Sequence, residues 1–284
     1  MSDQGSIVDQ PFGAVLPGST PPHSTGERGS QAPAPHGRPR SAETRRLYAA
    51  DWAAFVVWCR KGRHVAMPAS SATVAAYLAA STALKHGALA RRAAAIADQH
   101  HRNGQASPAA DAAVRAVVRN ARITSQSAGP DARPPRPRVR RRSPPGPAQL
   151  ARMAARCPGD LAGLRDRALL LLTAAGLGGE RLLALDREDV RLTGTEAELT
   201  VPGAAGRAGE VVVVNRVTGA IACPVRALED WLRSSDTGFG PVFRKVDRWG
   251  GVEHRRLRPD ALRRIWQRRA KAVRPSQRSA TASS

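Results

Sequence analysis

The stretch SAETRRLYAADWAAFVVWC, residues 41–59, sets the architecture of the first half of this chain. Ser41 is a good helix N-cap, because its hydroxyl can accept a hydrogen bond from a backbone N–H of the first turn. Apolar residues follow at i, i+4, i+7 and i+11, on one face of a helix: Tyr48, Trp52, Phe55 and Cys59. The stretch therefore predicts an amphipathic helix that ends at Lys61-Gly62.

Three further helices are predicted before residue 128. They cover residues 73–82, residues 89–102, and a segment that starts at Ser107-Pro108, where proline suits the first turn. Asn103-Gly104 ends the helix over 89–102. The residues expected on the inner faces are Val74, Tyr77, Leu78, Ala93, Ile96, Ala97, His100, Val114, Val117, Val118 and Ile123. Four short helices predict a small all-α domain over residues 41–128.

The segments outside the two predicted domains are polar and rich in proline. Residues 1–40 and 274–284 have no periodicity and too few apolar groups to offset the entropy cost of ordering, so we expect disordered tails. Residues 129–147 predict a linker in which prolines keep the backbone extended. This linker carries six arginines: Arg133, Arg136, Arg138, Arg140, Arg141 and Arg142.

Residues 148–273 predict a second domain that combines helices with a small sheet. Leu161, Leu164, Ala168, Leu171 and Leu172 repeat with helical spacing, and a short helix carries Leu182, Leu183 and Leu185. Strand-like runs cover residues 189–192, 197–201 and 210–214, and the turn at 203–209 predicts a hairpin between the last two. Pro224 and Pro259 begin two more helices. The second of these should turn Leu262, Ile265 and Trp266 inward and Arg263, Arg264, Arg268 and Arg269 outward. The predicted fold class is mainly α with a small antiparallel sheet.

The composition points to a polyanionic partner. The 284 residues contain 45 Lys+Arg and 23 Asp+Glu, for a formal net charge of +22. Such a surplus disfavours a neutral metabolic enzyme and favours nucleic acid, although GC-rich coding alone would also enrich Ala, Arg, Gly and Pro. Cys59, Cys157 and Cys223 form neither a metal-binding spacing nor an even disulfide framework. With no signal peptide and no apolar run long enough for a bilayer, we expect a cytoplasmic protein without membrane association, metal or small-molecule cofactor.

In order and spacing, these segments resemble the tyrosine recombinase (phage integrase) family. The match to its core-binding, SAM-like domain runs through Ser41 to Tyr48, Asp51-Trp52, Phe55, Pro68, Val74, Tyr77-Leu78, Arg91-Arg92, Ala95-Ile96 and His100. The match to its catalytic domain runs through Leu164 to Leu171, Leu182 to Leu185, Asp189-Val190, Cys223 to Leu228, Trp231-Leu232 and Gly240 to Arg244. The resemblance implies an N-terminal four-helix SAM-like domain followed by the first part of an α+β recombinase catalytic domain.

The resemblance also implies a chemistry whose residues this sequence does not supply in full. The family cleaves DNA with a tyrosine nucleophile, while arginines, a lysine and His or Trp residues stabilise the phosphate in the transition state. Gly178 stands where the first catalytic arginine is expected, and Arg181 lies about one helical turn further on. The 203–209 turn offers only Arg207 in place of a lysine, and an arginine pKa is too high for a general acid. Arg181 and Arg207 could still contact a phosphate, and they are the only catalytic candidates.

The family's nucleophile and its His-x-x-Arg sequence are also missing. Tyr48 and Tyr77 lie on the inner faces of predicted helices, and none of the seven histidines begins a His-x-x-Arg sequence. His100 and His101 invite a metal interpretation, but adjacent residues point to different faces of a helix, so structural or solvent-facing roles are favoured. We expect a recombinase gene product truncated by a frameshift or a premature stop, without strand cleavage.

DNA binding does not require the missing residues. The candidates for it share a positive charge or a place at a helix start, where free N–H groups favour phosphate. They are Thr44, Arg45, Arg46, Lys85, Arg91, Arg92, Arg140, Arg141, Arg142, Arg255, Arg256, Arg263 and Arg264, of which the last four are expected on the final helix. For each of these arginines, an ordinary solvated charge is the alternative.

The expected partners are double-stranded DNA and other recombinase protomers. Two alternatives stay open. One is an active recombinase whose missing residues come from another chain or from unusual substitutes. The other is a nucleic-acid binder that shares only the helical domain with the family.

Overall fold

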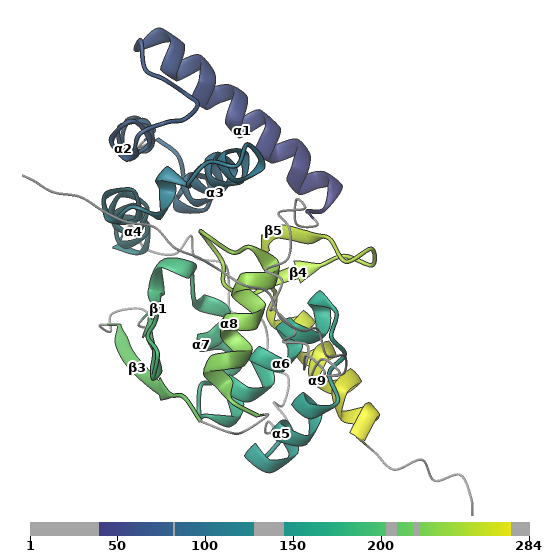
Figure 1. Ribbon diagram of the computed structural model, residues 1–284. Helices are drawn as coiled ribbons and strands as arrows, with labels where there is room; N and C mark the ends of the chain where they lie inside the picture. The colour runs from purple at the N-terminus through teal and green to yellow at the C-terminus, as the bar shows by residue number, and fades with distance from the viewer. Residues whose placement is uncertain (1–39, 82, 128–144, 203–208, 218–221, 274–284) are drawn as a thin grey trace, which may run out of the picture. The chain divides into compact units, whose positions relative to one another are not determined.

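The computed structural model describes residues 40–81, 83–127, 145–202, 209–217 and 222–273. It is mainly helical with a small antiparallel sheet, as predicted, and it has a second, two-stranded sheet (Figure 1). The elements are α1 (Ala42–Lys61), α2 (Ser71–Ala80), α3 (His86–Arg102), η1 (Pro108–Ala110), α4 (Ala112–Ser127), α5 (Pro147–Ala155), α6 (Leu161–Ala174), α7 (Gly179–Ala184), η2 (Arg187–Asp189), β1 (Val190–Leu192), β2 (Glu196–Val201), β3 (Glu210–Asn215), α8 (Pro224–Ser235), β4 (Arg244–Val246), β5 (Val252–Arg256) and α9 (Pro259–Val273). The predictions for both tails, most of the linker with Arg140, Arg141 and Arg142, and the turn with Arg207 lie outside the described residues.

Helix α1 forms as its sequence predicts. The Ser41 hydroxyl accepts a hydrogen bond from the Thr44 backbone N–H at 3.2 Å, and the helix ends at Gly62. Tyr48, Phe55 and Cys59 are buried, while Trp52 packs against them at the edge of the core. The apolar stripe therefore holds α1 against the helices that follow.

Helices α2 and α3 also bury the predicted faces, and His100 has the structural role expected of it. This side chain is fully buried in α3. Its Nε2 accepts from the Ala69 N–H at 3.0 Å, so Nδ1 carries the proton and donates to the Ile96 carbonyl at 2.8 Å. The histidine thus ties the loop before α2 to α3, and His101 faces solvent.

The fourth helix differs from its prediction at its start and at one residue of its inner face. Ser107-Pro108 opens only the single turn η1, whereas α4 begins at Ala112, after Asp111, whose side chain accepts from the Ala113 N–H at 2.8 Å. Ile123 is 55% exposed rather than inward. A side chain four residues after buried Val118 lies on the same helical face, and that position is Arg122, which is 8% exposed.

The second half folds around α6 and a three-stranded sheet. Helix α6 packs between α5 and α8, and its Ala168 to Leu172 are buried. The sheet has the order β1-β2-β3, with Val190 opposite Leu199 and Leu199 opposite Val212, so the predicted hairpin is confirmed. In α8, the fully buried Trp231 donates from its indole N–H to the Val242 carbonyl at 2.8 Å.

The β4–β5 hairpin was not predicted. Val246 pairs with Val252 across it, and Arg244 pairs with Arg256. These short strands are rich in charged residues and lack a clear apolar alternation, so the pattern of the sequence carries no strand signal. Arg255 and Arg256 consequently lie on β5 and not on the last helix.

Two hydrophobic clusters hold the described residues together. One joins α1, α2, α3 and α4 and also takes in Phe239, which follows α8 in the chain. The other joins the helices α5 to α9 with the three-stranded sheet. The domain boundaries at 41–128 and 148–273 stay predictions. None of the helices in the described ranges combines the length and apolar character of a membrane span.

Arg40 belongs to the folded part and not to the predicted tail. Its side chain is 3% exposed, and its guanidinium donates to the Ser235 carbonyl at 2.9 Å and to the Asp236 carboxylate at 2.7 Å. A third bond, at 3.4 Å, reaches Asp98 on α3. This arginine therefore connects α3 with the end of α8.

Candidate nucleic-acid interface

Of the three residues at the start of α1 that were predicted to contact DNA, two are exposed to solvent. Arg45 and Arg46 are exposed, and Arg46 forms no ion pair with any described residue. Thr44 is 1% exposed, and its hydroxyl donates to the Val252 carbonyl at 3.2 Å and accepts from the His254 N–H at 3.1 Å. The prediction that Thr44 meets phosphate is therefore corrected: its hydroxyl fastens β5 to α1.

The start of α3 combines one exposed lysine with two half-buried arginines. Lys85 is exposed at the N-cap position, with no side-chain capping bond. Arg91 binds the buried Asp51 carboxylate with Nε to Oδ2 at 2.7 Å, and this hydrogen bond raises the pKa of Arg91. Arg92 donates to the Ser81 hydroxyl at 2.8 Å and lies 5.2 Å from the Tyr77 ring centroid. Both arginines thus pack helices together and keep only part of their guanidinium for a ligand.

Strand β5 places one predicted arginine outside and one inside. Arg255 is exposed, and its guanidinium pairs with Glu43 on α1 at 2.6 Å. Arg256 instead donates to the carbonyls of Leu183 and Leu185 at 2.5 and 3.0 Å and pairs with Asp186. Its donors are mostly satisfied within the protein, so the expectation of a DNA contact has little support at Arg256.

His254 shows that three of these elements meet. Burial lowers its pKa, and the nearby positive charges of Arg91 on α3 and Arg255 on β5 lower it further. The same strand is bonded to Thr44 at the start of α1. The start of α1, α3 and β5 therefore form one basic area around His254, with Arg91 and Arg255 close to it.

Helix α9 carries both solvent-facing and buried arginines. Arg263 and Arg264 are exposed, as predicted. Arg269 was expected outward, but its side chain is 12% exposed and binds Asp166 at 2.7 Å. Asp166 is fully buried on α6 and also accepts bonds from Arg165 and Arg268. A buried carboxylate needs such partners, and this one draws Arg269 inward.

A second buried charge cluster was also missed by sequence reasoning. Asp186 lies 3.2 Å from Arg122 on α4, while Arg256 on β5 pairs with its other oxygen. Arg122 also pairs with Asp189 and donates to the Ala184 carbonyl at 2.7 Å. His86 stands 3.7 Å from Asp186, but burial lowers its pKa, so the imidazole is a neutral neighbour at pH 7.

Glu188 lies beside this cluster and has an unusually high pKa. Burial raises its pKa to about 7, and the nearby negative charges of Asp186 and Asp189 act in the same direction. One of its carboxylate oxygens accepts from the Gly240 N–H at 3.3 Å. Its hydrogen-bond partner Gly240 lies 52 residues away in sequence, and the burial that raises its pKa depends on tertiary packing, so no local pattern could have identified this group.

Of the two catalytic candidates, only Arg181 lies within the described ranges. Gly178 is the N-cap residue of α7, and Arg181 pairs with the exposed Glu210 at 2.5 Å on the protein surface. Tyr48 and Tyr77 are 5% and 3% exposed, and burial raises the pKa of Tyr77. Within the described ranges, no group of His, Cys, Asp and Glu side chains could hold a metal ion.

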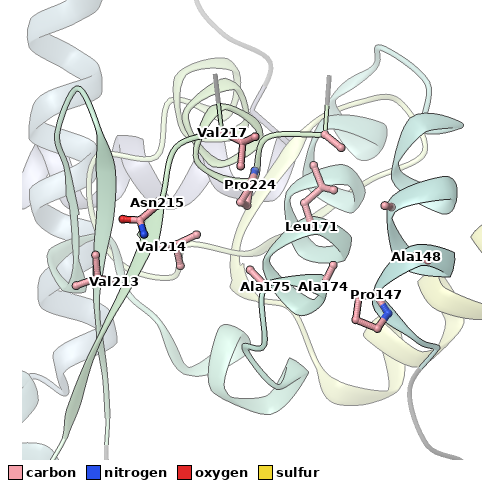
Figure 2. Close-up of a pocket in the computed structure, with 12 residues that line it drawn as sticks. Pro147, Ala148, Leu171, Ala174, Ala175, Val213, Val214, Asn215, Val217 and Pro224 are labelled. Atoms are coloured by element: carbon pink, nitrogen blue, oxygen red, sulfur yellow. The ribbon is translucent and has the colours of Figure 1, made fainter. Parts of the chain in front are cut away.

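A pocket of about 510 Å³ lies away from these charges, between α5, α6, β3 and the start of α8 (Figure 2). Leu171 and Ala174 line it from α6, and Val213 and Asn215 line it from β3. None of the described residues in its wall is ionisable, so it supplies no acid, base or cation.

Comparison with known proteins gives one informative similarity. No protein-family model matches the chain. A curated protein named "Integrase/recombinase xerD homolog", from Selenomonas ruminantium, is 28% identical in an alignment of 230 residues that covers 77% of this chain. The chain spans 64% of the length of that relative.

Proposed function

We propose that this chain is a DNA-binding protein of the site-specific recombinase (phage integrase) family, with double-stranded DNA and other recombinase protomers as partners. In this proposal, residues 41–128 are the core-binding domain and residues 148–273 belong to the catalytic domain. The support comes from the similarity to the xerD homolog and from the order of the motifs. The strongest support comes from one feature of the charge distribution.

That feature is the inward placement of the acids. Asp166 and Asp186 are fully buried and Asp51 is 7% exposed, and all three are paired with arginines. On the described surface, cations such as Arg46, Lys85 and Arg263 are exposed and form no ion pair with a described residue. Cations without partners gain from phosphate, because binding releases the counterions condensed on DNA.

We further propose that these 284 residues bind DNA without cutting it. Both tyrosine side chains of the sequence are buried in the helical half, so neither hydroxyl can attack a phosphate without unfolding its surroundings. Gly178 supplies no guanidinium where the resemblance expects one. The alternative is an active recombinase completed by residues of another chain.

Titration of the full chain with a labelled duplex at several salt concentrations tests DNA binding. Affinity should fall steeply with salt, and Lys85→Gln should reduce the slope of log K against log salt by about 1. Arg233→Gln is the matched control, because Arg233 already pairs with Asp230. If the chain fails to bind duplex at low salt, the proposal is wrong.

A nicked suicide duplex, which traps covalent protein–DNA intermediates, separates binding from cleavage. We expect a shifted complex that dissociates fully in detergent. A covalent adduct would contradict the proposal that the chain does not cut DNA, and would favour the active alternative.

A further inference from the structure

The turn between β4 and β5 presents a tryptophan to solvent. Trp249 is 77% exposed, whereas Trp231 is fully buried and the other three tryptophans pack against the two cores. The Arg248 guanidinium lies over the Trp249 ring, 4.1 Å from its centroid. Since a guanidinium can cover one face of an indole, the opposite face is left without a partner in the described protein.

This turn is rigid and anchored. Asp247 Oδ1 accepts from the backbone N–H groups of Trp249 and Gly251 at 2.9 and 2.7 Å, and the Asp247 N–H donates to the Gly251 carbonyl at 2.8 Å. Gly250 has φ +81, and a Cβ at Gly251 would lie 2.9 Å from the backbone of Ser41. The glycines thus let the turn pack against the start of α1. The hydrogen-bonded turn holds the indole in solvent.

The hairpin carries cations near the indole. Arg248 lies over the ring and forms no ion pair with a described residue, while Lys245 on β4 and Arg255 on β5 are paired with Glu253 and Glu43. The hairpin also adjoins the basic area at the start of α1, because Thr44 is bonded to Val252 (Figure 1). An aromatic face beside arginines is the combination that stacks on a nucleobase while the cations meet its phosphates.

We propose that Trp249 stacks on an unpaired nucleobase, so that the chain prefers DNA with unpaired bases to uninterrupted duplex. This inference rests on the proposed function, since the cations must first hold the DNA. In a duplex the bases already stack on one another, and inserting a side chain costs unstacking energy. An unpaired base offers its face without that cost, and the preformed turn adds no ordering cost on the protein side.

A protein or membrane partner fits the hairpin less well. The residues next to Trp249 in the turn are Asp247, Arg248 and two glycines, and Trp249 is the one exposed large apolar side chain among the described residues of this hairpin. Contiguous apolar patches that bind proteins cover several hundred Å². A single ring among charges favours stacking over burial in an apolar interface.

Equilibrium binding to two labelled probes tests the proposal: a blunt duplex, and the same duplex with a short central bulge of unpaired thymines. The wild-type chain should bind the bulged probe more tightly. Trp249→Ala should lose about tenfold in affinity for the bulged probe and little for the blunt one, while Trp249→Phe keeps most of the preference. The salt slope should not change, because the indole contacts no phosphate.

Val65→Ala is the matched control, since Val65 is an exposed apolar residue (64%) elsewhere on the surface and should leave both affinities unchanged. Equal binding of both probes by wild type and Trp249→Ala would overturn the inference and leave the proposed function intact. Failure of the wild type to bind either probe would overturn both. A Trp249→Ala variant that changes only self-association, or only binding to anionic phosphatidylserine vesicles, would assign the residue to a protein or membrane contact and overturn the inference.

Discussion

Asp166→Asn isolates the contribution of the buried charge cluster that fixes α9 to α6. The wild-type carboxylate is fully buried and accepts five hydrogen bonds. Arg165 supplies two of them to Oδ1, and Arg268 and Arg269 supply three to Oδ2. Asparagine keeps the shape but removes the charge and replaces one acceptor with an N–H₂ group that faces guanidinium donors.

The expected loss is large because buried cations remain without a counter-charge. Arg165 and Arg269 have side chains that are 6% and 12% exposed, so water cannot replace the lost carboxylate. Removing one partner of a buried ion pair costs about 3–5 kcal/mol. Arg268 is 58% exposed and adds little to that figure, since exposed pairs contribute roughly 0–1 kcal/mol.

Urea unfolding followed by far-ultraviolet circular dichroism measures this loss. With a slope of about 3 kcal/mol per molar urea, the midpoint should fall by more than ~1 M. Arg268→Gln is the matched control within the same cluster and should shift the midpoint by less than ~0.3 M. A midpoint for Asp166→Asn within that smaller range would refute the idea that this cluster holds α9 in place.

Three further predictions concern the second cluster and the exposed cations. Arg122→Gln should lower the free energy of unfolding by about 3 kcal/mol, because it removes the cation paired with Asp189 and one of the two arginines paired with Asp186. Arg119→Gln on the exposed face should change it by less than ~0.5 kcal/mol, and equal thermal midpoints for the two variants would contradict this. Burial raises the pKa of Glu188 in the folded state from its ordinary value of 4.5 to about 7, so its protonated form favours the fold at low pH and stability is lost as the pH rises to about 7. Glu188→Gln should therefore gain stability relative to wild type between those pH values and keep a constant advantage above them, and a difference in thermal midpoint that does not vary with pH would argue against it. Arg263→Gln should weaken DNA binding equally for unrelated duplex sequences, as expected for a phosphate contact, and loss at one sequence only would indicate base readout.

The sequence predicts the helices well because the apolar residues of each inner face repeat with helical spacing over a few residues. Tyr48, Phe55 and Cys59 repeat with helical spacing, and so do Leu228, Trp231 and Leu232, and these residues are buried. Ser41 and Pro224 mark helix starts through chemistry that acts within one turn. Such signals are local, so no tertiary information is needed to recognise them.

Buried arginines explain most of what could not be predicted. A charged residue on a helix reads as solvent-facing unless its partner is known, and those partners are remote. Arg122 meets Asp189 across 67 residues, and Arg269 meets Asp166 across 103. The same limit hid the role of Thr44, whose hydroxyl bonds to a strand 208 residues away.

The two kinds of arginine imply that stability and DNA affinity depend on separate sets of side chains. The arginines that pair with buried acids, such as Arg122, Arg165 and Arg269, have most of their donors satisfied inside the protein. Those without ion-pair partners among the described residues, such as Arg46 and Arg263, touch no core and cost little stability to replace. Neutralising the second set should therefore abolish the affinity for DNA while the thermal midpoint stays constant, and it can even rise, because a formal charge of +22 repels itself in the folded state. A loss of midpoint that tracks the loss of affinity would mean that one set of arginines serves both purposes.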